Sequence, residues 1–338
     1  MNIFADKFSQ KKWGVFNHYL FNDICKPENS KNMGTGITDW DSAVKLFDVE
    51  KLAYNLHKMN AGYYFITMMQ GSKHMLAPNA TYDTIAGTKP GGACSTRDLP
   101  MELADALAKY NIDLCLYYTG DGPHADREIG AKFGYAGDAG DGSSVDEAFC
   151  KNWSAVLEEY AVRYGNKVKA WWIDGCYREA LGYNEGYLSL YRDAVKKGNP
   201  EALVTFNQGV FAYLEKYWSL EDFTAGETNS FIYATPDKYI DGALSHTLAP
   251  LGYNPHGEHW YEWCGWGCRG LKHTKEYMRD YIRNFTGHGG IVSVDIYVNI
   301  DGSFDPEQQA FLEWVGNNLS CKYHHWQKPT DFLSVFSC

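Results

Sequence analysis

Two acidic residues stand where they could carry out a hydrolytic reaction. Asp174 ends the apolar stretch 168–174 (VKAWWID), and Glu227 follows 53 residues later in the segment FTAGETN. One carboxylate that attacks and a second carboxyl group that donates a proton are the minimum apparatus for breaking a glycosidic bond. Asp174 is therefore the candidate nucleophile and Glu227 the candidate acid/base. The plainer alternatives are a helix cap for Asp174 and an ordinary loop carboxylate for Glu227.

An aromatic tract offers an alternative proton donor. The segment 256–266 reads HGEHWYEWCGW and places Glu258 among several tryptophans. Burial against aromatic rings raises the pKa of a carboxyl group toward the range of a proton donor. Glu258 is the second candidate for the acid/base, unless this tract is a surface loop whose tryptophans pack into the core.

Aromatic residues make up 16% of the chain, with 11 Trp, 25 Tyr and 17 Phe. Aromatic faces stack on the apolar faces of sugar rings, although an aromatic-rich core has the same composition. Side chains near expected strand ends, together with those of the aromatic tract, are the candidates for contacting a sugar. They are His18, His74, Tyr118, Trp172, Asn207, Trp260 and Trp263.

The elements that position these residues alternate between amphipathic helices and short apolar strands. Helical periodicity predicts helices over 48–60, 98–110, 145–164, 185–198 and 273–285, and a last helix that starts at Asp305 and Pro306. Strands are expected at 13–19, 62–68, 112–118, 168–174, 202–207, 223–228, 243–248 and 290–298.

Eight strands that alternate with helices favour a single-domain (β/α)8 barrel of the TIM type, in which catalytic groups lie at the carboxyl ends of the strands. No GxGxxG follows the first strand, which argues against a dinucleotide-binding sheet. We expect the catalytic barrel to span 1–319. The remaining residues, 320–338, are too few for a domain and should pack on the barrel.

An ordered series of segments resembles the family 29 α-L-fucosidases. WWIDG (171–175) is similar to the strand-end motif of that family, whose Asp is the nucleophile, and KKWGVFNHYL (11–20) is similar to its opening strand and its His. Residues 47–67, 96–120 and 281–304 resemble further segments in the same order. The resemblance implies a retaining, exo-acting hydrolase that works by double displacement through a glycosyl-enzyme intermediate on Asp174, with His18 contacting the sugar.

Two segments depart from the pattern of that family. Its KHHDGF stretch after the second strand is replaced by TMMQGSKHM (67–75), where His74 substitutes only if the loop is rebuilt. The Arg that usually follows the fifth strand is replaced by TFNQGV (205–210). The sugar is therefore open: the alternatives are a different sugar, for example galactose-configured, or a barrel that binds carbohydrate without hydrolysing it.

Composition and charge argue against several classes of partner and cofactor. The formal net charge is −11, which disfavours nucleic acid as a partner, and no apolar run is long enough to cross a membrane. The first residues lack the apolar core of a secretory signal, so we expect a cytoplasmic location with reduced cysteines. The tract Cys264, Cys268, His273 fits no common zinc spacing, and we expect no metal and no cofactor.

Overall fold

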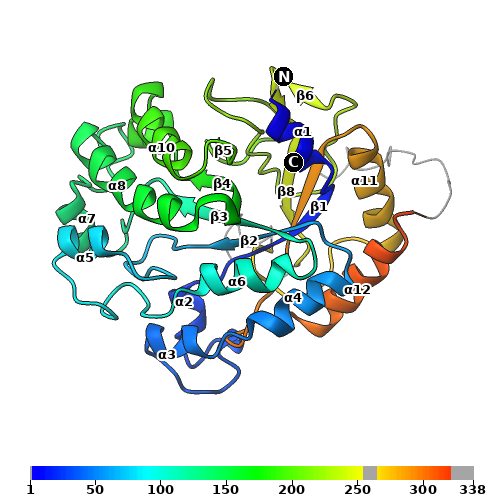
Figure 1. The fold of residues 1–338 in the computed structure, drawn as a ribbon, viewed down its shortest axis with the longest axis horizontal. Coiled ribbons are helices and arrows are strands. Elements are labelled where there is room, and N and C mark those ends of the chain that lie inside the picture. Colours follow the sequence, from blue (N-terminus) through cyan, green and yellow to red (C-terminus); the bar gives the residue numbers. More distant parts are fainter. Residues whose placement is uncertain (1, 254–264, 321–338) are drawn as a thin grey trace, which may run out of the picture.

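The computed structural model describes residues 2–253 and 265–320. Its centre is a curved parallel sheet of seven strands in the order β5-β4-β3-β2-β1-β9-β8, with the helices arranged around its outside (Figure 1). The strands are β1 (Trp13–Asn17), β2 (Tyr63–Thr67), β3 (Asp113–Thr119), β4 (Val168–Asp174), β5 (Leu203–Phe206), β8 (His246–Pro250) and β9 (Ile291–Asp295), and a separate hairpin joins β6 (Tyr239–Ile240) to β7 (Ala243–Leu244).

Most of the larger helices begin at a side chain that caps them. Asp98 accepts a hydrogen bond from the backbone of Met101, and Asp305 caps the last helix, whose first residue is proline, as the sequence predicts. The helices are α1 (Ile3–Ser9), α2 (Phe21–Ile24), α3 (Trp40–Lys45), α4 (Val49–Lys58), α5 (Ala80–Ala86), α6 (Leu99–Ala108), α7 (Arg127–Phe133), α8 (Glu147–Tyr164), α9 (Arg178–Leu181), α10 (Glu185–Gly198), α11 (Lys275–Gly287) and α12 (Pro306–Asn317), with 3-10 turns η1 (Ser30–Asn32) and η2 (Gly165–Lys167).

Alternate residues of each strand face two different cores. Trp171 and Ile173 of β4 pack outward, in the larger core that contains the inner faces of the helices. Trp172 points to the concave side of the sheet, where it packs in a second core with Phe16 and Tyr117. Because both faces are covered, the strands are almost continuously apolar, as parallel sheets require.

The expected strand 223–228 does not form a regular strand, which corrects the prediction of eight. Phe223 and Glu227 make only isolated bridges, to Leu244 and Leu248. The segment bonds to both of its neighbours: the backbone N–H of Asp222 donates to Val204 of β5, and that of Leu248 donates to Gly226. The sheet is thus consistent with a TIM-like barrel but is not closed by regular pairing.

The part of the chain between α10 and α11 does not follow the alternation of helix and strand seen in the rest of the molecule. Between β5 and β6 the chain forms neither helix nor regular strand in the described structure. Helix α1 covers the amino ends of the strands nearby, with Phe8 in the concave core and Asn2 donating to Asp222. Of the tail 320–338, which we expected to pack on the barrel, only Ser320 lies within the described residues.

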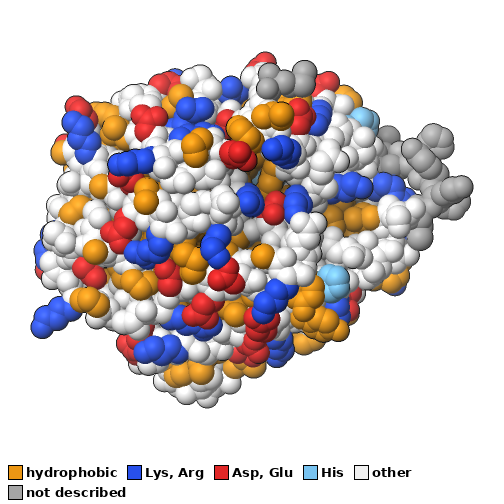
Figure 2. Space-filling model, viewed as in Figure 1, with side chains coloured by type: hydrophobic (Ala, Val, Ile, Leu, Met, Phe, Trp, Pro, Cys, Tyr) orange, Lys and Arg blue, Asp and Glu red, His pale blue; other side chains and the backbone are white. Residues whose placement is uncertain are grey.

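Charged side chains are distributed over the surface. Figure 2 shows Lys and Arg interspersed with Asp and Glu over the face drawn. Along the described part of the chain, no helix is long and apolar enough to cross a membrane.

Candidate active site

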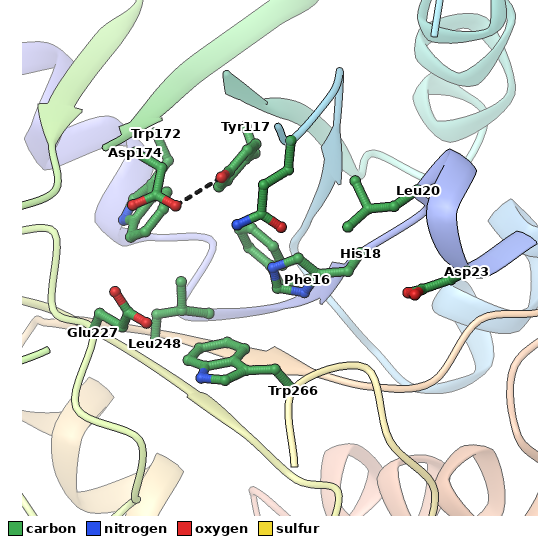
Figure 3. Close-up of a pocket in the computed structure, with 11 residues that line it drawn as sticks. Phe16, His18, Leu20, Asp23, Tyr117, Trp172, Asp174, Glu227, Leu248 and Trp266 are labelled. Carbon is green, nitrogen blue, oxygen red and sulfur yellow. Dashed lines mark hydrogen bonds between the residues drawn. The ribbon is translucent and has the colours of Figure 1, made fainter. Parts of the chain in front are cut away.

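A cavity of about 210 Å³ lies at the carboxyl ends of the strands. Figure 3 shows that Asp174 and Glu227 face each other at one end of it, with Leu20 and Asp23 at the other. The lining residues are Phe16, His18, Leu20, Asp23, Gln70, Tyr117, Trp172, Asp174, Glu227, Leu248 and Trp266.

A single amide nitrogen bonds to both carboxyl groups. Nδ2 of Asn207 donates to Oδ1 of Asp174 at 2.8 Å and to Oε2 of Glu227 at 2.6 Å. These two oxygens can be no farther apart than the sum of the two distances, about 5.4 Å. The second oxygen of Asp174, Oδ2, accepts a hydrogen bond from the hydroxyl of Tyr117 at 2.7 Å.

Three neighbouring segments hold this arrangement. Asp174 is the last residue of β4, and Asn207 follows β5, with its backbone N–H bonded to the carbonyl of Ile173. Glu227 sits in the irregular segment beside β8, where it bridges to Leu248. The carboxylates and the amide between them are therefore fixed by backbone pairing.

The two carboxyl groups have different electrostatic environments. Burial and, to a smaller extent, the charge of Asp174 raise the pKa of Glu227 to about 8, against the lowering effect of the hydrogen bond from Asn207. Burial also raises the pKa of Asp174, against the lowering effect of hydrogen bonds from Tyr117 and Asn207. Asp174 accepts hydrogen bonds from two side-chain donors and Glu227 from one, so the hydrogen bonds favour the charged form of Asp174 more strongly than that of Glu227.

His18 is oriented by a buried carboxylate. Its Nδ1 lies 2.8 Å from Oδ1 of Asp295, at the end of β9, and the other oxygen of Asp295 accepts from the backbone N–H of Gly267 at 2.6 Å. His18 lines the cavity (Figure 3), and because Nδ1 contacts Asp295, Nε2 is the ring nitrogen left for a ligand. In this orientation the ring can form a hydrogen bond with a ligand hydroxyl.

Aromatic rings make two walls of the cavity. Trp172 stacks on Tyr117 with ring centroids 5.5 Å apart, and its indole N–H donates to the carbonyl of Ala225. Trp266 is half-buried on another side, and its indole N–H donates to Asn229. These hydrogen bonds fix the two rings where they line the cavity, and an aromatic ring in such a place can stack on the apolar face of a sugar.

Three predicted contact residues lie elsewhere. Tyr118 points outward and donates to the carbonyl of Trp153, so the wall residue is Tyr117, its neighbour on the strand. His74 stacks on Phe21 at 3.7 Å, outside the lining, and burial lowers its pKa to about 4. Asn207 is buried and bonds to the carboxylates instead of lining the cavity.

Seven lining residues are not among the predicted site residues: Phe16, Leu20, Asp23, Gln70, Tyr117, Leu248 and Trp266. Tyr117 could have been found from strand alternation, since it is the register partner of Trp172, which lies two residues before Asp174. Gln70 and Trp266 lie in connections and Asp23 in a helix of a single turn, where the sequence gives no period to follow.

Some sequence predictions concern residues outside the described part of the chain. Glu258, Trp260 and Trp263 belong to this group, and so does Cys264. Within the described residues no group of three or more His, Cys, Asp or Glu side chains could hold a metal ion. The described cysteines are free thiols.

Comparisons with known proteins show relationships at the level of structure. No protein-family model and no curated protein matches the sequence. An endo-fucoidan hydrolase of glycoside hydrolase family 107 is similar over 94% of this chain and 64% of its own, with 13% identity and a TM-score of 0.71. The chain has the fold of these hydrolases.

Two further solved structures have the same fold. An α-L-fucosidase of family GH29 from Bacteroides thetaiotaomicron matches with 18% identity and a TM-score of 0.62, over 94% of this chain and 73% of that one. The α-L-fucosidase AlfC matches with 15% identity and a TM-score of 0.62, over 94% and 98%. The chain spans less than two thirds of the length of the endo-fucoidan hydrolase.

Proposed function

We propose that this protein is a retaining, exo-acting glycoside hydrolase that removes an α-L-fucosyl unit, with Asp174 as the nucleophile and Glu227 as the acid/base. The TIM-like sheet serves as the barrel of this enzyme, and the irregular segment 222–228 takes the place of its sixth strand. The similarity to α-L-fucosidases and endo-fucoidan hydrolases supports fucose as the sugar. A cavity of about 210 Å³ suits one sugar ring, because sites for drug-sized ligands run ~300–1,000 Å³.

The observation that carries the proposal is the shared amide nitrogen of Asn207. It limits the separation of the facing oxygens of Asp174 and Glu227 to about 5.4 Å. Retaining glycosidases place their carboxyl groups ~5–5.5 Å apart, whereas inverting enzymes need ~6.5–9.5 Å to fit a water molecule. The short separation favours direct attack on the sugar by Asp174.

In the first step, the ionised Asp174 attacks the anomeric carbon and forms an ester bond to it. The bond from that carbon to the glycosidic oxygen breaks, and Glu227 donates its proton to this oxygen, so the aglycone leaves as an alcohol. The raised pKa of Glu227, about 8, keeps that proton available at neutral pH.

In the second step, Glu227 is ionised and takes a proton from a water molecule. The water oxygen attacks the anomeric carbon, the ester bond to Asp174 breaks, and the sugar leaves with its original configuration. Tyr117 and Asn207 donate to Asp174 and stabilise it as the leaving carboxylate. His18 and the faces of Trp172 and Trp266 orient the sugar through both steps.

Release of nitrophenol from a panel of aryl glycosides tests the proposal. The panel contains the α-L-fucoside and the α- and β-D-galactosides, and the proteins are wild type, Asp174→Asn, Glu227→Gln and Asp193→Asn. Asp193 is exposed on α10 and is the matched control. We expect hydrolysis of the α-L-fucoside, lost by at least 1,000-fold in Asp174→Asn and unchanged in Asp193→Asn.

The other outcomes are equally informative. Turnover of a galactoside alone would keep the mechanism and change the sugar. Full activity of a folded Asp174→Asn variant would refute the assignment of the nucleophile. If no glycoside reacts but a free sugar raises the melting temperature, the protein is a carbohydrate-binding barrel and not a hydrolase.

A further inference from the structure

The end of the cavity away from the catalytic pair carries a third carboxylate. Asp23, in the short helix α2, lines the same cavity as Asp174 and Glu227. Figure 3 shows it at the opposite end, beyond His18. A sugar whose anomeric carbon lies between the catalytic pair would direct the other side of its ring toward Asp23.

A buried ammonium group holds Asp23 in place. Nζ of Lys31 lies 2.8 Å from Oδ2 of Asp23, and the side chain of Lys31 is only 5% exposed, against 34% for Asp23. Gly267 leaves room for this contact, since a Cβ at that position would lie 2.8 Å from the same Nζ. The carboxylate is therefore fixed from behind and presented to the cavity.

One oxygen of Asp23 is left for a ligand. Its Oδ2 is engaged by Lys31, and within the described part of the chain Oδ1 has no hydrogen-bond partner. An ionised carboxylate is an acceptor only, so it bonds to a hydroxyl group and repels a sulfate or another carboxylate.

The charges of the lining act in the same direction. Among the described residues that line the cavity none is Lys or Arg, and in the proposed mechanism Asp174 is a second negative charge beside Asp23 while Glu227 is neutral. Lys31 is covered, so a ligand meets the carboxylate of Asp23 and not the cation behind it. Arg is the usual partner for a sulfate or a carboxylate, and this lining offers none.

We propose that Asp23 is a specificity-determining residue: its free oxygen accepts a hydrogen bond from a sugar hydroxyl remote from the reacting carbon, and the cavity thereby selects an uncharged sugar unit over a sulfated or carboxylated one. The inference rests on the proposed function for the orientation of the sugar. It adds to that function a residue that binds the sugar and a preference for sugars without a negative charge.

Binding of free sugars, measured by titration calorimetry, tests the inference without requiring turnover. The ligands are L-fucose, D-galactose and the monosulfated derivatives of each. The proteins are wild type, Asp23→Asn, Asp23→Ala and the control Asp193→Asn, each checked by its melting temperature. The Asn variant keeps the shape of Asp23 and removes only its charge.

We expect wild type to bind at least one neutral sugar at least tenfold more tightly than its sulfated derivatives. In Asp23→Asn the ratio of the two affinities, neutral over sulfated, should fall below threefold. In Asp23→Ala the affinity for the neutral sugar should fall at least tenfold. Asp193→Asn should change neither the ratio nor the affinity. The inference is overturned if wild type binds no neutral sugar, binds the sulfated sugars equally well, or keeps its preference after Asp23→Asn. Failure of hydrolysis with this binding pattern intact would count against the proposed function alone.

Discussion

At the scale of single residues, one amide group organises the site. Asn207 donates the same Nδ2 to Asp174 and to Glu227, and Tyr117 adds a second donor to Asp174 alone. Two carboxyl groups in contact with one donor compete for a negative charge, and the extra hydrogen bond decides which of them holds it. The proposed division of roles, with Asp174 as nucleophile and Glu227 as acid/base, rests on this asymmetry.

Tyr117→Phe tests that asymmetry. Losing a hydrogen bond to a charged group costs about 1.5–3 kcal/mol, so we expect kcat/KM at neutral pH to fall about 10–100-fold. The pKa of Asp174 should rise, because the lost bond lowers it. The acidic limb of the pH profile of kcat/KM should therefore move to higher pH.

Tyr118→Phe is the matched control for this variant. Tyr118 donates to the carbonyl of Trp153, outside the cavity. The Tyr118→Phe variant should lose some stability, while the acidic limb of its pH profile of kcat/KM stays where it is in wild type. Identical pH profiles for wild type and Tyr117→Phe would show that Tyr117 does not hold the charge on Asp174.

Glu221 gives a second prediction at this scale. It is buried and immediately precedes the segment 222–228 that carries Glu227, and burial raises its pKa to about 9. The unfolded chain releases this proton near pH ~4.3, whereas the folded chain keeps it, so Glu221 destabilises the fold increasingly as pH rises between these values. Glu221→Gln lacks this effect, because the amide carries no charge in either state.

The melting temperatures of wild type and Glu221→Gln at pH 5 and pH 8 measure the difference. The variant should be more stable at pH 8, by on the order of a few kcal/mol, and close to wild type at pH 5. A gain that is the same at both pH values would contradict the raised pKa.

The sequence predicted part of this residue-scale picture. The sequence placed Asp174 and Glu227 at the ends of two expected strands, and in the structure both line the same cavity although the second strand is irregular. Tyr117 was missed in favour of Tyr118 because a buried strand is apolar on both faces, and its letters do not show which side points to the cavity. His74, a predicted contact residue, lies outside the lining because the loop after β2 places it against Phe21.

At the scale of elements, the segment 222–228 carries Glu227, the proposed acid/base, without being a regular strand. Gly226 has a φ of +67°, a conformation that interrupts extended pairing and that a side chain rarely adopts. A Cβ at this position would also collide with the backbone carbonyl of His246. The glycine thus lets Glu227 approach β8 closely and turn toward Asp174.

Gly226→Ala should therefore unfold or displace this segment. We expect a loss of more than about 3 kcal/mol in stability, measured by urea unfolding, and a loss of activity in the protein that remains folded. Gly242→Ala is the control: its φ is +84°, but nothing lies within 4 Å of an added Cβ. It should cost only the backbone strain, about 1–2 kcal/mol, with activity intact. Equal losses in the two variants would show that the approach to His246 is unimportant.

The helices were easier to predict from the sequence than this segment. Amphipathic periodicity and capping residues such as Asp98 and Asp305 locate α6 and α12 within a few residues. The expected sixth strand failed because its pairing depends on contacts with Val204 and Leu248, which are distant in the sequence.

At the scale of the whole molecule, helix α1 covers one end of the sheet. Phe8 packs on Tyr63 in the concave core, with ring centroids 5.1 Å apart. The sheet is predictable as a TIM-like architecture because helices and strands alternate along the chain. The open pairing beside β5 and the covering helix are not, because both depend on how distant segments meet.

Phe8→Ala tests how far this cover stabilises the molecule. Removing a buried aromatic ring costs about 3 kcal/mol or more, so the melting temperature should fall by several degrees while KM of the folded enzyme stays within twofold. Ile3→Ala, at an exposed position of the same helix, should change stability by less than about 0.5 kcal/mol. A Phe8→Ala variant as stable as wild type would mean that α1 contributes little to the core.

The most direct test of the catalytic pair is rescue by azide. In Asp174→Gly, azide can enter the space of the missing carboxylate and attack the aryl glycoside from that face, giving a glycosyl azide of inverted configuration. In Glu227→Ala, azide replaces water in the second step, giving a glycosyl azide of retained configuration. NMR of the two products gives the anomeric configuration of each glycosyl azide. We predict the inverted configuration from Asp174→Gly and the retained configuration from Glu227→Ala. The same configuration from both variants, or no rescue of Glu227→Ala, would contradict the proposed roles of Asp174 and Glu227.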